Sequence, residues 1–199
     1  MTVQSNILSD KALDTIFRTA RTYNAWQDKE VSQTLIKAVY DLLKMGPTSA
    51  NCSPARFKFL TSDAAKLRLK PHLSEGNVEK TMTAPVVVII GQDMEFYEKL
   101  PKLFPHTDAR SWFAGKEQAI KSTAMRNGTL QSAYLMIAAR SLGLDCGAMS
   151  GFNADAVTEE FFGGTTIKAD LLCNIGYGSE ENLFERSPRL EFDEACEIL

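Results

Sequence analysis

The chain is most informative at Gly46-Pro47-Thr48-Ser49-Ala50-Asn51-Cys52-Ser53-Pro54, a stretch that directly follows an amphipathic helical run. Pro47 has no backbone donor and a fixed φ, so a helix should end just before it. The loop that follows offers hydroxyl groups, an amide side chain and free N–H groups, which suits a polar planar ligand with both donors and acceptors. The ordinary alternative is a loop that stops a helix and whose side chains only cap its own backbone.

Composition predicts one globular domain over residues 1–199. The chain contains 44% hydrophobic and 24% charged residues, and it is long enough to bury a substantial core. Its formal net charge of −3 gives no electrostatic footprint for nucleic acid or for an anionic membrane. Neither class of partner is therefore expected, and small-molecule chemistry stays open.

The cysteines and the N-terminus together predict a cytoplasmic protein. Cys52, Cys146, Cys173 and Cys196 lie far apart and show no metal-ligand spacing, so no metal site is expected. Residues 1–10 lack the basic and apolar regions of a signal peptide. The longest aliphatic run, residues 86–90, is far too short to cross a bilayer.

Hydrophobic periodicity predicts helices and strands around a small sheet. The expected strands are residues 56–61, 86–91 and 171–177. The expected helices run from a Ser9 cap to about residue 20, from a Ser32 cap, over residues 62–71 and over residues 118–141. The last of these is apolar nearly all round, so its own core or a partner chain should bury it. Such a mixture is typical of an α+β or α/β sandwich.

Four further segments stand out beside residues 46–54. They are Arg21-Thr22-Tyr23-Asn24-Ala25-Trp26, Asn77-Val78-Glu79-Lys80, Ala148-Met149-Ser150-Gly151-Phe152 and Ser187-Pro188-Arg189-Leu190. In this order and spacing, the five segments resemble the nitroreductase family of FMN-dependent oxidoreductases, and the similarity covers nearly the whole chain. The resemblance implies an α+β three-layer sandwich, with a mainly antiparallel central sheet flanked by helices. It also implies an intertwined homodimer that exchanges a C-terminal strand.

The resemblance implies noncovalently bound FMN and assigns its contacts by position. Arg21, Thr22 and Arg189 match residues that hold the phosphate, for which the planar fork of a guanidinium is well suited. Asn24 and Asn77 match positions that face the pyrimidine edge of the flavin. The remaining matches are Pro47, Thr48, Ser49 and Asn51, in a loop lent by the partner subunit, and Met149, Ser150 and Gly151, in a turn near flavin N5. A backbone donor at Ser150 would tune hydride transfer, which makes it a candidate catalytic residue. The ordinary alternatives are surface arginines and a simple turn between a strand and a helix.

The chain also departs from the family pattern near the flavin. Ala20 stands where many members carry an arginine, so other residues must match the phosphate charge. Asn24 replaces the usual lysine or arginine, which removes a cation beside the pyrimidine edge. Ser53 and Ala55 replace a frequent glutamine and tryptophan. These departures argue against broad nitroaromatic activity.

Within the family, the chain is most similar to malonic semialdehyde reductases of pyrimidine degradation. Residues 46–56, 104–106, 108–113 and 149–152 carry this similarity. It implies ping-pong hydride transfer from NADPH or NADH, with reduction of malonic semialdehyde to 3-hydroxypropionate. The alternatives are a reductase of nitroaromatics, quinones or enones, and a flavin-binding protein without turnover.

Arg110 is the second candidate catalytic residue. It lies in an aromatic-rich segment, in the region where the family builds a mobile lid, and a cation there would orient a small anionic acceptor. Trp112 and Phe113 would exclude water and strengthen an arginine–carboxylate pair. The alternative is that Arg110 pairs with Asp108 or another acid at the surface.

Overall fold

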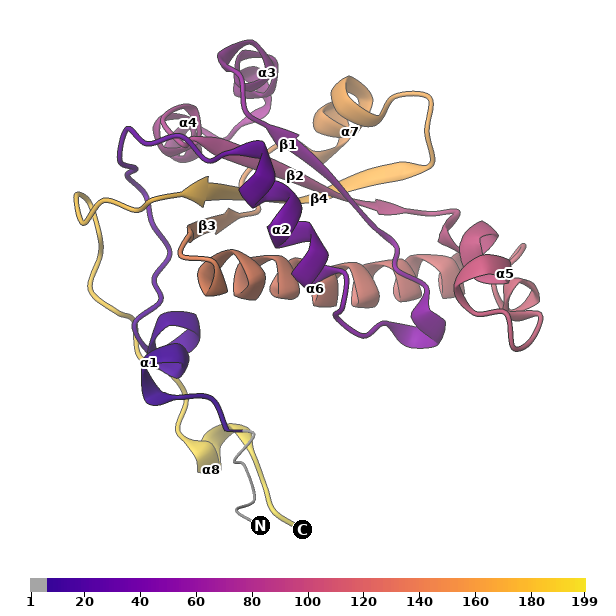
Figure 1. Cartoon of the computed structure of the whole chain (residues 1–199). Coiled ribbons are helices and arrows are strands. Elements are labelled where there is room, and N and C mark those ends of the chain that lie inside the picture. The colour runs from indigo at the N-terminus through magenta and orange to yellow at the C-terminus, as the bar shows by residue number, and fades with distance from the viewer. Residues whose placement is uncertain (1–6) are drawn as a thin grey trace.

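Residues 7–199 are described by the structure, a computed structural model, and they form one antiparallel sheet between two layers of helices (Figure 1). The strands are β1 (Ala55–Leu60), β2 (Val86–Asp93), β3 (Asp145–Met149) and β4 (Ile167–Gly176). Their order across the sheet is β1-β2-β4-β3, and each neighbouring pair is antiparallel. This arrangement confirms the predicted α+β three-layer sandwich.

The two faces of the sheet contact different helices. Val86, Val88 and Ile90 of β2 pack in the cluster that contains residues of α2 (Gln33–Leu43) and α6 (Glu117–Ser141). Val87 and Ile89 pack in the cluster with residues of α3 (Asp63–Leu69) and α7 (Ala154–Phe162). Successive side chains of a strand point to opposite faces, so a strand buried on both sides has to be apolar throughout. This is why residues 86–90 form an unbroken aliphatic run.

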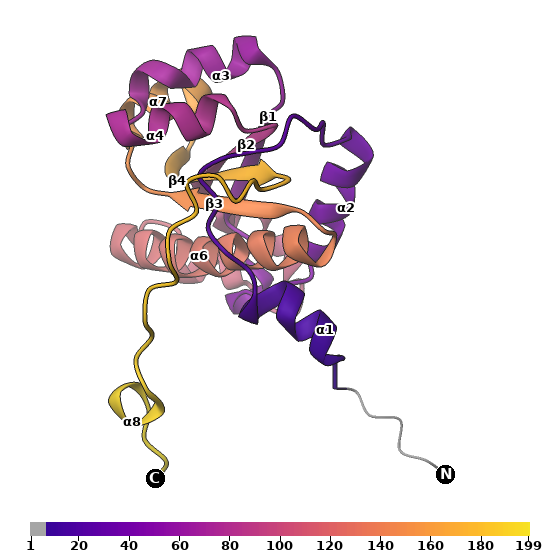
Figure 2. The same ribbon diagram turned by 90° about the vertical axis from the view of Figure 1, so that its left-hand side faces the viewer.

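Most of the helices lie on the two sides of the sheet, whereas the first and the last lie away from it, as Figures 1 and 2 show. The helices are α1 (Asp10–Leu13), which continues as the π-helical turn η1 (Asp14–Arg18), α2 (Gln33–Leu43), α3 (Asp63–Leu69), α4 (Glu75–Met82), α5 (Leu100–Leu103), α6 (Glu117–Ser141), α7 (Ala154–Phe162) and α8 (Phe192–Ala195). Short 3-10 turns are η2 (Ser49–Asn51), η3 (Lys70–His72), η4 (Phe96–Lys99) and η5 (Ala109–Trp112). The predicted caps are confirmed, because Ser9 and Ser32 accept hydrogen bonds from the backbone N–H three residues later.

α6 is less completely buried than its apolar sequence predicts. Its fully buried side carries Leu135, Ala138 and Ala139, and also the polar residues Asn127 and Gln131. The polar side chains bond to the backbone of neighbouring elements, since Asn127 accepts from Ser49 N at the start of η2 and Gln131 accepts from Ala55 N at the start of β1. Other apolar residues of α6 stay exposed, with Met125 60% and Leu130 44% accessible. Within one chain, the core therefore covers only part of the apolar surface of this helix.

The C-terminal segment leaves the body of the molecule after β4 and ends in α8 (Figures 1 and 2). Five of its apolar side chains are largely exposed: Phe184, Leu190, Phe192, Ile198 and Leu199. Within residues 7–199, none of the helices has both the length and the apolar character needed to span a membrane.

Candidate cofactor-binding site

The segment with Arg21, Thr22 and Asn24 is fixed along the edge of the sheet beside β3. Thr22 forms a parallel bridge with Cys146, and Tyr23 N donates to the Cys146 carbonyl at 3.1 Å. The Tyr23 ring packs against Gly178, where a Cβ would come within 2.3 Å of the ring. Because only a glycine leaves room for the ring at 178, this contact holds the segment in place.

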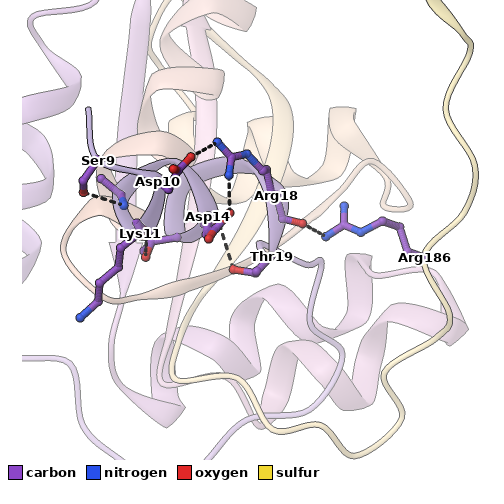
Figure 3. A network of polar contacts seen from close by, with 9 residues as sticks. Ser9, Asp10, Lys11, Asp14, Arg18, Thr19 and Arg186 are labelled. Atoms are coloured by element: carbon purple, nitrogen blue, oxygen red, sulfur yellow. Dashed lines mark hydrogen bonds and ion pairs between the residues drawn. The ribbon is translucent and has the colours of Figure 1, made fainter. Parts of the chain in front are cut away.

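Four of the predicted cofactor residues line one cavity of about 490 Å³. These are Arg21, Thr22, Asn24 and Arg189, although the first three are more than 160 positions from the fourth. Arg21 donates to the Phe184 carbonyl, and Arg186 donates to the Ala20 carbonyl at 2.7 Å. Arg186 also donates to the Arg18 carbonyl at 2.9 Å (Figure 3). These contacts fasten the C-terminal segment to the residues just after α1.

A second group of predicted residues meets at the start of α4. Asn77 Nδ2 donates to the Gly151 carbonyl at 2.7 Å, and Ser74 N donates to the same oxygen at 3.1 Å. A Cβ at Gly151 would lie 2.5 Å from Asn77 Nδ2, so a glycine is required for this approach. Ser150 is exposed directly after β3, and Met149 is buried at its end.

Lys80 is a further candidate site residue, which was not among the residues predicted from the sequence. Its Nζ lies 3.5 Å from Asn24 Oδ1. Lys80 therefore places a positive charge beside Asn24, the position at which the resemblance implies a lysine or arginine. The Lys80 carbonyl accepts from both Trp26 Nε1 and Asn174 Nδ2 at 2.9 Å, which fixes the end of α4. Lys80 also lines an adjoining cavity of about 340 Å³ that shares Asn24 and Phe184 with the first. The available signal was its spacing from Asn77, because residues three apart share one face of a helix.

The loop at residues 46–54 lies elsewhere in the same chain, beside α5 (Figure 1). Ala50, Asn51 and Ser53 have φ values of 49°, 51° and 39°, an uncommon conformation for residues other than glycine. Side chains hold the loop, since Thr48 Oγ1 accepts from Ser53 N and Asn51 Nδ2 donates to the Leu103 carbonyl. Within residues 7–199, no hydrogen bond joins this loop to either of the two groups described above. One chain therefore does not bring Pro47, Thr48, Ser49 and Asn51 to the cavity.

Arg110 lies on the same side of the molecule as this loop. Ala109 packs in one buried cluster with Cys52, and the Phe113 ring contacts the Phe96 ring at a centroid distance of 5.0 Å. The Arg110 guanidinium itself forms an ion pair with Glu98, which is the surface alternative considered above. Within one chain, the two candidate catalytic residues, Ser150 and Arg110, belong to different parts of the fold.

Comparison with known proteins places this architecture in a family. The model of the family described as "Nitroreductase family" matches residues 17–179. A relative from Burkholderia lata, provisionally named NADH dehydrogenase/NAD(P)H nitroreductase, is 60% identical over 191 residues, covering 96% of this chain and 98% of the relative.

Solved structures agree in fold. A structure from Bacillus subtilis, provisionally described as a nitroreductase, has a TM-score of 0.86 at 18% identity and covers 96% of this chain and 100% of its own. Another, from Exiguobacterium sibiricum and solved in complex with FMN, has a TM-score of 0.84 at 19% identity and covers 98% and 100%. The chain therefore belongs to the nitroreductase family.

Proposed function

We propose that this chain is an FMN-dependent NAD(P)H oxidoreductase that works by ping-pong hydride transfer. The observation that supports it most is the cavity in which Arg21, Thr22, Asn24 and Arg189 meet. The Burkholderia lata relative, whose name includes NAD(P)H nitroreductase, supports the same class of reaction. When bound, FMN would supply the hydride chemistry, because no amino-acid side chain transfers a hydride.

The residues present fit an elongated ligand with one anionic and one hydrogen-bonding end. Arginines dominate the larger cavity and suit a phosphate. Asn24 lines both cavities, and Lys80 stands beside it in the smaller one. An amide and a cation there suit the carbonyls and the N3–H of a flavin pyrimidine edge, and the lysine favours negative charge at that edge.

The turn after β3 would act through its backbone. Gly151 is fixed by two donors to its carbonyl, from Asn77 and from Ser74 N. Ser150 is exposed beside it. A backbone N–H held in this way would orient the reacting ring without acid–base chemistry of its own.

We also propose a homodimer in which each flavin site is completed by the second subunit. Two observations support it: the loop at residues 46–54 and Arg110 lie away from the cavity within one chain, and α6 leaves Met125 and Leu130 exposed. The exposed apolar residues of the C-terminal segment would cover such a surface on the partner. Four free cysteines among residues 7–199 fit the predicted cytoplasmic location.

The proposed acceptor is malonic semialdehyde, which would be reduced to 3-hydroxypropionate, and it rests on the sequence resemblance alone. Arg110 of the partner subunit would then orient the acceptor carboxylate. A nitroaromatic or quinone acceptor is the second candidate, favoured by the name of the Burkholderia lata relative.

Three measurements test the proposal on the purified full-length chain. We expect a yellow protein that releases FMN on denaturation and sediments as a dimer. Stopped-flow mixing with NADPH or NADH should bleach the flavin, and addition of malonic semialdehyde should restore its colour. A colourless protein that does not bind FMN would overturn the proposal, and bleaching followed by reoxidation only with quinones or nitro compounds would favour the second acceptor. Bound flavin without bleaching would identify a carrier.

A further inference from the structure

The larger cavity carries more positive charge than its predicted ligands account for. Besides Arg21 and Arg189, it is lined by Arg140 and Arg186, and the acidic side chain in its lining is Glu185. Four guanidiniums and one carboxylate leave a local excess of three positive charges, in a chain whose formal net charge is −3. Like charges that share a concave site repel one another, so such a site favours a multiply charged anion.

The four arginines differ in what their side chains contact. Arg21, Arg186 and Arg189 each donate to backbone carbonyls of the chain itself. The Arg140 guanidinium has no hydrogen bond or ion pair within the described residues 7–199. It is half-buried, in the last turn of α6, and faces this cavity. Its donors are therefore available to a ligand.

Arg186 stands beside the position where this chain lacks an arginine. Its Nη2 donates to the Ala20 carbonyl at 2.7 Å. The same atom donates to the Arg18 carbonyl at 2.9 Å, the contact drawn in Figure 3. Arg18 itself cannot contribute freely, because its guanidinium forms ion pairs with Asp10 and Asp14 at 2.9 Å. Arg186 and Arg140 thus bring positive charge from the C-terminal segment and from α6 to the cavity that Ala20 also lines.

We propose that Arg140 binds the phosphate of the cofactor, in the cavity that Arg21, Arg186 and Arg189 also line. This inference rests on the proposed FMN-dependent function. A guanidinium binds a phosphate through parallel charge-assisted hydrogen bonds, and a dianion would neutralise most of the local excess. The ordinary alternative is that Arg140 only stabilises the C-terminal end of α6 through the helix dipole. If Arg140 binds the phosphate, replacing it should weaken the binding of a ligand that carries a phosphate and leave a ligand without one unaffected. If Arg140 only stabilises the helix, both ligands should be affected alike.

The experiment compares FMN with riboflavin, which lacks the phosphate, on flavin-free full-length protein. The variants are Arg140→Met, which keeps the length of the side chain, and Arg140→Lys, which keeps the charge. Arg68→Met is the control, because Arg68 is an exposed arginine of α3 outside the cavity, paired with Glu160. Flavin fluorescence quenching gives Kd for both ligands, and the melting temperature with and without millimolar inorganic phosphate gives a readout that needs no flavin.

We expect Arg140→Met to raise the Kd for FMN by about tenfold or more, with an unchanged Kd for riboflavin. Arg140→Lys should fall between the wild type and Arg140→Met, and Arg68→Met should match the wild type. Phosphate should raise the melting temperature of the wild type more than that of Arg140→Met. Equal losses for FMN and riboflavin, or no loss for either, would overturn the inference.

The proposed function fails in a different way. The wild type could bind neither flavin and still show a larger rise in melting temperature with phosphate than Arg140→Met does. That result would support the anion site and contradict the flavin-dependent function. If the wild type bound neither flavin and phosphate raised the melting temperatures of the wild type and of Arg140→Met equally, the anion site would be contradicted as well.

Discussion

Arg110 and Glu98 form a bidentate ion pair: Arg110 Nε lies 2.8 Å from Glu98 Oε2, and Arg110 Nη2 lies 2.7 Å from Glu98 Oε1. This geometry occupies the same fork that a substrate carboxylate would use. A hydrogen bond from Arg110 holds the pKa of the Glu98 carboxyl below its ordinary value, so the pair persists at neutral pH. If Arg110 binds an anionic acceptor, Glu98 has to release it or share it.

Two variants separate these roles in the turnover of malonic semialdehyde. Arg110→Ala removes the fork, and if Arg110 orients the acceptor we expect kcat/KM to fall by roughly 30-fold or more, with unchanged flavin content. Glu98→Gln removes the competing carboxylate but keeps the arginine, so kcat/KM should hold or rise. Bleaching by NAD(P)H should be normal in both variants. An unaltered kcat/KM in Arg110→Ala would leave Arg110 as a surface ion-pair residue only.

The same ion pair predicts a pH dependence of stability. A carboxyl whose pKa is lower in the folded than in the unfolded protein stabilises the fold above its ordinary pKa of 4.5. That contribution is lost as the pH falls through the lowered folded value. The melting temperature of wild type should therefore exceed that of Glu98→Gln slightly at pH 7, and the two should converge in acid. A difference that grew towards acid would contradict this assignment.

The end of α4 offers a test of how the site is held. Trp26 Nε1 and Asn174 Nδ2 both donate to the Lys80 carbonyl, and Asn174 is fully buried. Trp26→Phe keeps an aromatic ring but removes one donor, so we expect about 1 kcal/mol less free energy of unfolding in urea. Because Lys80 and Asn77 share α4, the Kd for FMN should also rise. Trp112→Phe, at an exposed tryptophan of η5, is the matched control for stability. A stability loss with unchanged flavin affinity would mean that the contact does not position the site.

The cysteines should differ sharply in reactivity. Cys196 is exposed, whereas Cys52, Cys146 and Cys173 are buried. Burial raises the pKa of Cys52 to about 11, and a hydrogen bond with Cys146 together with burial raises that of Cys173 well above its ordinary value. Since the thiolate is the reactive form, a disulfide reagent at pH 8 should label Cys52, Cys146 and Cys173 only after unfolding. Cys196 should be the one thiol that reacts in the folded protein, and, because it lies in the C-terminal segment, its rate should fall where the proposed dimer covers that segment. A second fast thiol in the folded wild type, or a fast thiol left in Cys196→Ser, would refute this.

The strands with strong local patterns could be predicted from sequence, whereas the elements with weak patterns could not. Residues 86–91 fall within β2 because a dense β-branched run has little alternative to a buried strand. α4 was not predicted, since it contains Gly76 and few apolar residues, and it is held in place largely by side chains from other elements. Lys80 was missed with it, because its role depends on the contact with Asn24 across 56 positions.

The candidate site shows the same division. Family resemblance predicted Arg21, Thr22, Asn24 and Arg189 as cofactor residues, and these four residues line one cavity. Their contact with a flavin stays a prediction. The resemblance did not point to Arg140 or Arg186, which line the same cavity, because the departure at Ala20 leaves open which other residues match the phosphate charge. That answer needs the path of the C-terminal segment past α1 and the end of α6, which no local pattern encodes.

The exposed apolar surface of α6 leads to a prediction about assembly. Leu130 on α6 is 44% accessible and Leu67 on α3 is 56% accessible, so either position accepts a charge without disturbing a buried side chain. If a second copy of the chain covers α6, Leu130→Glu would bury an unpaired carboxylate, which is strongly unfavourable. We therefore expect Leu130→Glu to sediment as a monomer or a much weaker dimer and to lose FMN, because each site would lack the loop at residues 46–54 of the partner.

The control is Leu67→Glu, which lies on the other helical layer and should keep both the dimer and the flavin. A flavin-loaded monomer of Leu130→Glu would show that one chain suffices for the site, and a dimer of unchanged affinity would show that the partner docks on another face.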